Sequence, residues 1–245
     1  MIAIYRDIAP VDILAIGIHP DDVELSASGT VLKHIAAGAT VGICDLTQGE
    51  LGSRGTPETR HQEAIDASEI LGIDWRANLG MPDGYAYVTK ERVLQIAEVI
   101  RLARPQVILA NAIDDRHPDH ARGANLVKEA FFFSGLSKIT SIQGAPHRAD
   151  VLYHYIQDKQ LIPDLCVDVT PYVAQKMQSI IAYKTQFFQG DNSDSQGVQT
   201  PISGEGFLNL LKAKMRVFGR YIQVDYAEGF NSASPIQMNN LLTSA

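Results

Sequence analysis

Short apolar runs alternate with amphipathic stretches along most of the chain. The apolar runs are typical of buried strands, which we expect at residues 12–18, 40–46, 77–79, 107–110, 151–156 and 165–169. Apolar positions at helical spacing predict helices at residues 23–37, 58–71, 90–103, 118–133, 171–184 and 207–222. Strands that alternate with helices predict an α/β fold of the three-layer, Rossmann-like kind, with a mostly parallel sheet and helices on both faces.

The pattern indicates a single domain. The chain contains no internal repeat and no segment that resembles a linker, so we expect one domain over residues 1–245. Residues 47–57 are rich in glycine and polar side chains, which predicts a loop. Residues 188–204 are also polar and rich in Gly and Ser, and their length is unusual for an internal loop, which predicts a mobile lid.

Composition and charge exclude several classes of protein. Hydrophobic residues make up 45% and charged residues 20%, which is typical of a globular chain. The net charge of −7 argues against binding to nucleic acid, which requires a basic surface. No run of about 18 apolar residues occurs and the first residues lack a basic signal-peptide start, so we expect no membrane contact and a cytoplasmic location. Cys44 and Cys166 lie in predicted strands and are expected to be buried thiols.

Two polar clusters follow predicted strands. Residues 19–22 (HPDD) come directly after the first strand, and residues 114–120 (DDRHPDH) come a few residues after the strand at 107–110. Open parallel sheets bind their ligands at the carboxyl ends of the strands. We therefore expect both clusters to lie at the same edge of the sheet.

The spacing within these clusters favours a metal site. His19 and Asp22 are three residues apart, as are His117 and His120, and side chains at this spacing face the same way on a helix. Two His and one Asp suit Zn²⁺ with a fourth position for water, and Fe²⁺ or Mn²⁺ would accept the same donors. For one cluster alone, helix capping by Asp21 and Asp22 is the simpler interpretation. Two clusters that share the pattern His-Pro-Asp favour one shared metal site.

These clusters belong to a wider resemblance. The chain resembles the PIG-L/LmbE-like zinc-dependent N-deacetylases in the stretches IGIHPDDVELSASGTVL and RHPDH. The likeness extends through DLTQGELGSRGTPETRHQEA, NLGMPDG, NAIDDRHPDHARGANLV and YAEGF, so that it covers about 220 of the 245 residues. Within this family the motifs are most similar to those of the bacillithiol biosynthesis deacetylases.

The resemblance implies an activity and its partners. It implies a metal-dependent hydrolase that removes the N-acetyl group from N-acetyl-α-D-glucosaminyl L-malate, an N-acetylated amino sugar, and releases acetate and glucosaminyl malate. Because relatives cleave other N-acetyl sugars, the alternative substrates are N-acetylglucosamine, a chito-oligosaccharide and a thiol conjugate. The resemblance also implies a homo-oligomer, a trimer or a hexamer.

Roles for individual residues follow from the same resemblance. It makes His19, Asp22 and His120 the ligands of a zinc ion and Asp21 the general base. His117 would lie beside the metal and stabilise the oxyanion. This division agrees with the chemistry, because two adjacent aspartates cannot easily point at one ion, and one of them is then available to take a proton.

Two arginines are candidates for substrate binding. Arg54 lies in the glycine-rich loop GSRGTP, and Arg148 precedes the predicted strand at 151–156. A guanidinium group offers two parallel donors to a carboxylate, and the malate part of the expected substrate carries two carboxylates. Glu50 and Asp83 lie in loops at the same expected edge, where they could bind sugar hydroxyls or face solvent.

Two other classes of protein compete with this interpretation. A nucleotide-binding Rossmann protein fits the alternation of strands and helices, but the first strand runs into HPDD rather than GxGxxG, and no GxxxxGK[ST] occurs. A non-catalytic sugar-binding protein on the same fold conflicts with the intact set of His and Asp residues. Metal content after purification distinguishes both classes from a metal-dependent hydrolase.

Overall fold

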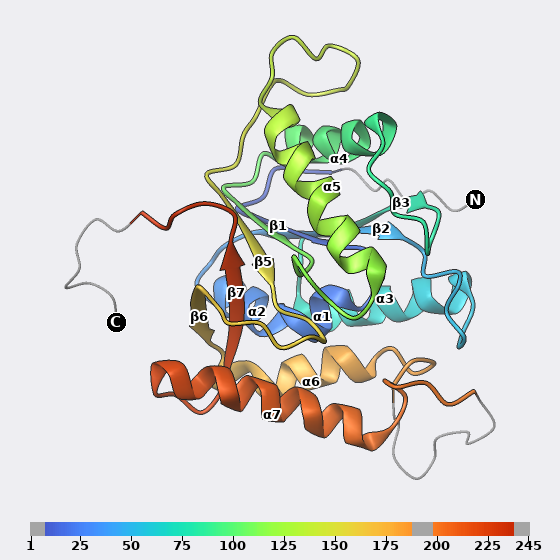
Figure 1. Cartoon of the computed structure of the whole chain (residues 1–245), viewed down its shortest axis with the longest axis vertical. Coiled ribbons are helices and arrows are strands. Elements are labelled where there is room, and N and C mark those ends of the chain that lie inside the picture. Colours follow the sequence, from blue (N-terminus) through green and yellow to red (C-terminus); the bar gives the residue numbers. More distant parts are fainter. Residues whose placement is uncertain (1–7, 188–197, 238–245) are drawn as a thin grey trace.

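The computed structural model describes residues 8–187 and 198–237 and contains a seven-stranded sheet in the order β3-β2-β1-β4-β5-β7-β6 (Figure 1). Its strands are β1 (Ile13–Gly17), β2 (Val41–Thr47), β3 (Trp75–Met81), β4 (Val107–Ala110), β5 (Val151–Tyr155), β6 (Leu165–Asp168) and β7 (Ala227–Ser232). The first five strands pair in parallel, whereas β7 runs antiparallel to both β5 and β6. The predicted α/β fold with a mostly parallel sheet is confirmed.

Helices cover both faces of this sheet. Helices α4 and α5 pack together on one face, α1, α2 and α3 lie on the other, and α6 and α7 lie beyond them (Figure 1). The helices are α1 (Asp22–Ser26), α2 (Ser28–Ala36), α3 (Pro57–Leu71), α4 (Lys90–Ala103), α5 (Pro118–Ser134), α6 (Val173–Ile181) and α7 (Glu205–Ile222). None of the described helices is both long and apolar enough to cross a membrane.

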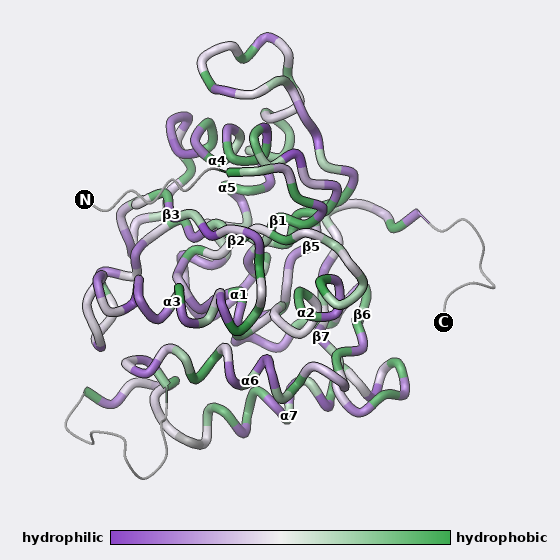
Figure 2. Tube along the Cα trace, turned by 180° about the vertical axis from the view of Figure 1, so that it is seen from behind, coloured by the Kyte–Doolittle hydropathy of each residue, from purple (hydrophilic) through white to green (hydrophobic). Residues whose placement is uncertain are grey.

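The central strand β1 is buried on both faces. Leu14 and Ile16 pack into the hydrophobic cluster shared with α4 and α5, while Ile13 and Ala15 pack into the cluster shared with α1 and α2. Full burial of a Leu or Ile side chain contributes about 1.5–3 kcal/mol relative to exposure, so this strand is a rigid base for the residues that follow it. Figure 2 shows hydrophobic and hydrophilic residues interspersed along the helices, as expected where one helix face packs on a core.

One predicted helix, at residues 23–37, is two helices in the structure. The chain leaves helical geometry at Ala27, which has φ of −137° and ψ of 0°. Side chains from distant elements satisfy the backbone groups at this break. Lys176 Nζ donates to the carbonyls of Glu24 and Leu25 at 3.1 and 2.9 Å, and Glu228 accepts from the backbone N–H groups that begin α2. These partners explain why the break is stable although the local pattern indicates a continuous helix.

Other differences concern the last part of the chain. Strand β7 was not expected, because its sequence AEGFNS lacks an apolar alternation, yet five of its six residues are buried. Helix α6 is shorter than expected and is preceded by a 3₁₀ helix at Thr170–Tyr172. Of the predicted lid at 188–204, residues 188–197 lie outside the described residues. Cys44 is buried as expected, whereas Cys166 is partly exposed.

Candidate metal centre and active-site pocket

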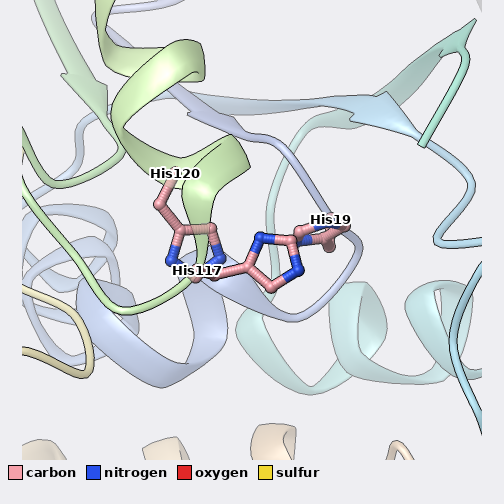
Figure 3. Close-up of side chains that lie close together, drawn as sticks. All are labelled: His19, His117 and His120. Atoms are coloured by element: carbon pink, nitrogen blue, oxygen red, sulfur yellow. The ribbon is translucent and has the colours of Figure 1, made fainter. Parts of the chain in front are cut away.

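The two polar clusters meet where the sheet order reverses. Strands β1 and β4 are neighbours, with β2 on the far side of β1 and β5 on the far side of β4, and open α/β sheets form their binding crevice at such a point. His19 follows β1, and His117 and His120 lie at the start of α5, which follows β4. The three rings lie close together (Figure 3), with centroids 4.8 Å apart for His19 and His117 and 5.0 Å apart for His117 and His120.

The carboxylate of Asp22 lies between two of these histidines. Asp22 Oδ2 is 3.6 Å from His19 Nδ1, and Asp22 Oδ1 is 3.2 Å from His120 Nε2. Donor atoms about 2.0–2.1 Å from a tetrahedral metal ion lie about 3.3–3.4 Å from one another. Both distances are near this value, although they involve different oxygens of Asp22, so His19, Asp22 and His120 are candidate ligands of one ion. A ring nitrogen of His117 lies within 4.8 Å of nitrogens of the other two histidines, so His117 is beside the same position.

The opposite nitrogens of two histidines contact further carboxylates. His19 Nε2 is 3.0 Å from Asp83 Oδ1, and His120 Nδ1 forms a hydrogen bond with Asp115. Metal-binding histidines usually donate their second ring N–H to a carboxylate, which fixes the tautomer and leaves the other nitrogen available to the metal. His19 and His120 both have these surroundings, which is a second reason why the residues fit a metal ion.

Two amide side chains fix the orientation of Asp22. Asn111 Nδ2 donates to Oδ2 at 2.9 Å and Gln157 Nε2 donates to Oδ1 at 3.0 Å, while the backbone N–H of His19 also donates to Oδ2 at 2.9 Å. Asn111 follows β4 and Gln157 follows β5. The ends of three adjacent strands therefore hold one buried carboxylate in place.

Asp21 has partners different from those of its neighbour. Its φ of +117° lies in the left-handed region, which Asp and Asn tolerate better than most other residues. Its Oδ2 accepts from Arg60 Nη2 at 2.9 Å, and both residues are 5% exposed. Asp21 lines the same pocket as the three histidines. Of the two adjacent aspartates, Asp22 therefore contacts the histidines and Asp21 contacts an arginine.

Burial and charge set the protonation of the cluster. Burial raises the pKa of Asp21 to about 7, although the Arg60 guanidinium lowers it. Burial alone would lower the pKa of His19, but Asp22 and Asp83 outweigh this effect and the pKa rises to about 10. Burial would raise the pKa of Asp22, but His120 and His19 hold it well below its usual range. The surroundings of Asp22 therefore favour positive charge.

His117 differs from the other two histidines. Burial lowers its pKa, and the charges of His19 and His120 lower it further. Its Nδ1 accepts from the backbone N–H of Asp119 at 3.3 Å. A neutral ring that accepts at Nδ1 carries its proton on Nε2, so His117 is arranged as a neutral N–H donor.

A pocket of about 670 Å³ includes these residues, a volume typical of sites for small molecules. One part of its wall is polar and contains the histidines, Asp21 and Arg60. Another part is apolar and comes largely from α7, with Leu211, Met215 and Phe218. The pocket therefore offers room beside the histidine cluster for a group larger than an acetamide.

The predicted substrate-binding arginines lie in two different places. Arg54 is half-buried and its Nε donates to the carbonyl of Thr185 at 2.7 Å, while its neighbour Ser53 lines the pocket. Arg148 precedes the amino end of β5, opposite the carboxyl ends that carry the site, and its guanidinium lies over the Phe132 ring at 5.1 Å. The structure therefore does not bring Arg148 to the site, and its predicted substrate contact has no support in this arrangement.

The two loop carboxylates support each other. Asp83 lines the pocket and contacts His19, as described above. Glu50 Oε1 accepts from the backbone N–H of Asp83 at 2.8 Å, and Asp83 Oδ2 accepts from the backbone N–H of Leu51 at 3.0 Å. Asp83 is therefore engaged with a predicted metal ligand, and Glu50 helps to hold the Asp83 loop.

Four residues that hold the cluster were not predicted from the sequence: Arg60, Asn111, Asp115 and Gln157. Asp115 lies in the cluster DDRHPDH, and its acidity next to two histidines was a signal for a supporting role. Arg60 lies in the stretch TPETRHQEA, which contributed only to the resemblance. No local sequence pattern predicts the roles of Asn111 and Gln157. Each follows a strand and donates to Asp22, which lies 89 and 135 positions earlier, respectively.

Fold and site together define an α/β protein with a buried His/Asp cluster that fits a metal ion, in a pocket at the carboxyl ends of its parallel strands. The PIG-L family, described as GlcNAc-PI de-N-acetylase, matches residues 14–131. The chain is also 37% identical to the conserved protein TT1542 of Thermus thermophilus, whose crystal structure superposes with a TM-score of 0.84 over 94% of this chain and 98% of that protein. The chain belongs to the PIG-L family of deacetylases.

Two relatives with a named activity are less similar to this chain than TT1542 is. The chain is 29% identical to a diacetylchitobiose deacetylase of Thermococcus kodakarensis, over 71% of this chain and 70% of that enzyme. It is 22% identical to a 4-oxalmesaconate hydratase of Pseudomonas putida, over 93% of this chain and 91% of that enzyme. Relatives of this chain therefore catalyse more than one reaction.

Proposed function

We propose that the protein is a metal-dependent N-deacetylase that hydrolyses N-acetyl-α-D-glucosaminyl L-malate in bacillithiol biosynthesis. The observation that carries the proposal is the arrangement of His19, Asp22 and His120 around one position, with Asp21 held separately by Arg60 in the same pocket. Family membership and the deacetylase activity of the Thermococcus relative support the reaction. The resemblance of the motifs to bacillithiol biosynthesis deacetylases supports the substrate.

His19, Asp22 and His120 would hold the metal ion, for which we propose Zn²⁺, with Fe²⁺ and Mn²⁺ suited to the same donors. Such an ion, when bound, polarises a carbonyl group and lowers the pKa of water. Asp21 takes a proton from the water whose oxygen attacks the acetamide carbon, and Arg60 holds the carboxylate for this step. Asp21 then returns the proton to the sugar nitrogen as the C–N bond breaks, which leaves acetate and a free amine.

His117 assists at the carbonyl oxygen. As the carbon becomes tetrahedral, negative charge develops on this oxygen, and a donor that is already in place stabilises the charge. The Nε2–H group of neutral His117 can serve as that donor, because Nδ1 accepts from the backbone of Asp119. This role requires no proton beyond the one that the neutral ring carries.

The substrate has alternatives within the same reaction class. N-acetylglucosamine, a chito-oligosaccharide and a thiol conjugate each carry the same acetamide on an amino sugar. Arg54 stays a proposed contact for the malate carboxylates through the guanidinium nitrogens other than Nε. We also propose that the chain forms a homo-oligomer, a trimer or a hexamer, whose mass analytical ultracentrifugation measures.

Acetate release tests the function. Zinc-loaded protein is incubated with N-acetyl-α-D-glucosaminyl L-malate and, in parallel, with N-acetylglucosamine, and the metal content per chain is measured. We expect one metal ion per chain and a strong preference for the malate glucoside. Activity on the plain sugar alone would refute the substrate and keep the hydrolase chemistry. No acetate from either compound, with metal bound, would refute deacetylation of both and direct attention to the hydratase relative.

A further inference from the structure

The charges that line the pocket are unevenly partnered. Among the described residues four Lys or Arg side chains line it, and three of them form ion pairs with carboxylates. The three pairs are Arg60–Asp21 at 2.9 Å, Lys176–Glu228 at 2.6 Å and Arg116–Asp158. The fourth cation, Lys214, has no carboxylate within the 4.0 Å of an ion pair in the part of the chain that the structure describes. Lys214 is therefore the pocket cation that has a charge to offer to a ligand.

Lys214 lines the same pocket as the proposed metal ligands. It comes from α7, and its ammonium group donates to the backbone carbonyl of Asp158 at 3.3 Å. The preceding residue, Gln157, donates to the carboxylate of Asp22 at 3.0 Å. One short segment of chain thus contacts both Asp22 and Lys214, so a ligand over the metal centre can extend to Lys214 within the same pocket.

The surroundings of Lys214 favour an anion as its partner. Met215 and Phe218 of the same helix line the pocket, and a charge interaction is stronger beside apolar walls than in bulk water. Burial lowers the pKa of Lys214 to about 8, with Asp115 and Asp158 acting against this shift and Lys176 acting with it. A carboxylate that reached Lys214 would supply the missing counter-charge.

We propose that Lys214 forms a carboxylate-binding subsite for the group attached to the sugar. The preferred substrates are then N-acetylated amino sugars that carry an anionic substituent. The inference rests on the deacetylase activity proposed above and adds a residue that selects among substrates. The sequence predicted this role for Arg54, whose Nε donates to the carbonyl of Thr185.

The test compares variants on two substrates of different charge. The variants are Lys214→Gln, which removes the charge, Lys214→Arg, which keeps it, and Arg54→Gln. Lys212→Gln is the matched control, because Lys212 is exposed on the same helix and does not line the pocket. Acetate release is measured with the malate glucoside and with neutral methyl N-acetylglucosaminide, and binding of the product glucosaminyl malate is measured by calorimetry.

Lys214→Gln should raise KM for the malate glucoside and Kd for the product about 10-fold or more, a typical effect of losing one hydrogen bond to a charged group. KM for the neutral glycoside should stay within about twofold, and Lys214→Arg should restore most of the affinity. Equal losses on both substrates, or unchanged product binding, would overturn the subsite. Selectivity that depends on Arg54 and not on Lys214 would overturn it as well. If the wild type releases no acetate but product binding depends on Lys214, the subsite stands and the proposed activity fails.

Discussion

Replacement of Asp21 by Asn separates the proposed proton acceptor from the proposed metal ligands. Asn has nearly the same shape as Asp, tolerates the left-handed backbone at this position, and can still accept the hydrogen bond of Arg60 through its amide oxygen. We therefore expect Asp21→Asn to leave Asp22 in place and to retain the metal. An amide cannot take a proton from water at neutral pH, so the variant should lose the general base alone.

The structure sets the size of two effects. General-base catalysis contributes about 10²–10⁴-fold, so kcat should fall by that factor, which corresponds to about 2.7–5.5 kcal/mol of activation free energy. Arg60 is 5% exposed and would lose its carboxylate partner while it keeps the carbonyls of Pro20 and Gly49. Because burial raises the pKa of Asp21 to about 7, its charged and neutral forms are nearly equal in free energy in the folded protein at pH 7, so a neutral Asn that keeps the hydrogen bond of Arg60 should change the free energy of unfolding by only about 1 kcal/mol.

Three measurements on one preparation test this reasoning: kcat from acetate release, zinc per chain by mass spectrometry, and unfolding in urea. Asp150→Asn is the matched control, because Asp150 is exposed and lies before β5, away from the site. A metal-loaded Asp21→Asn enzyme with near wild-type kcat would refute the base assignment. Loss of metal in proportion to activity would show instead that Asp21 acts through metal binding.

Three further predictions concern charge and packing. Lys176→Met should lower the free energy of unfolding in urea by about 3–5 kcal/mol, because it leaves the buried carboxylate of Glu228 without its cation. Adding Glu228→Gln should recover part of this loss, and no recovery would contradict the charge argument. Gly42→Ala would place a Cβ 2.3 Å from the ring of Trp75, the sole tryptophan. The fluorescence emission of Trp75 should therefore shift, and the free energy of unfolding should fall by about 1–3 kcal/mol. Unchanged emission would contradict this packing. KM for the malate glucoside should rise above pH about 8 as the Lys214 ammonium loses its proton, relative to KM for the neutral glycoside; the same rise in Lys214→Arg would refute this assignment.

The parallel part of the fold could be predicted because its strands are buried on both faces. A strand such as β1 is then an uninterrupted apolar run, and the helices that cover it carry apolar positions at regular spacing. Strand β7 breaks this rule. It places Glu228 in the interior, where the charge is balanced by Lys176 of α6 and by backbone N–H groups of α2. A local pattern cannot reveal such partners, because they come from positions 52 and 199 residues away.

In the candidate site, too, the sequence predicted the types of residue but not their partners. His19, Asp22 and His120 could be predicted as candidate metal ligands because the pattern His-Pro-Asp is chemically unusual after a buried strand, and the structure brings the three side chains together. The arginines were identifiable only as cations, and a cation binds a substrate anion only if the protein has not already neutralised it. Arg60 and Arg116 line the pocket but are paired with Asp21 and Asp158, respectively. From the sequence alone, all of these cations are equal candidates for binding an anion. The tertiary structure shows which of them are paired with carboxylates, and among the described residues that line this pocket the cation without such a pair is Lys214, which lies in none of the motifs.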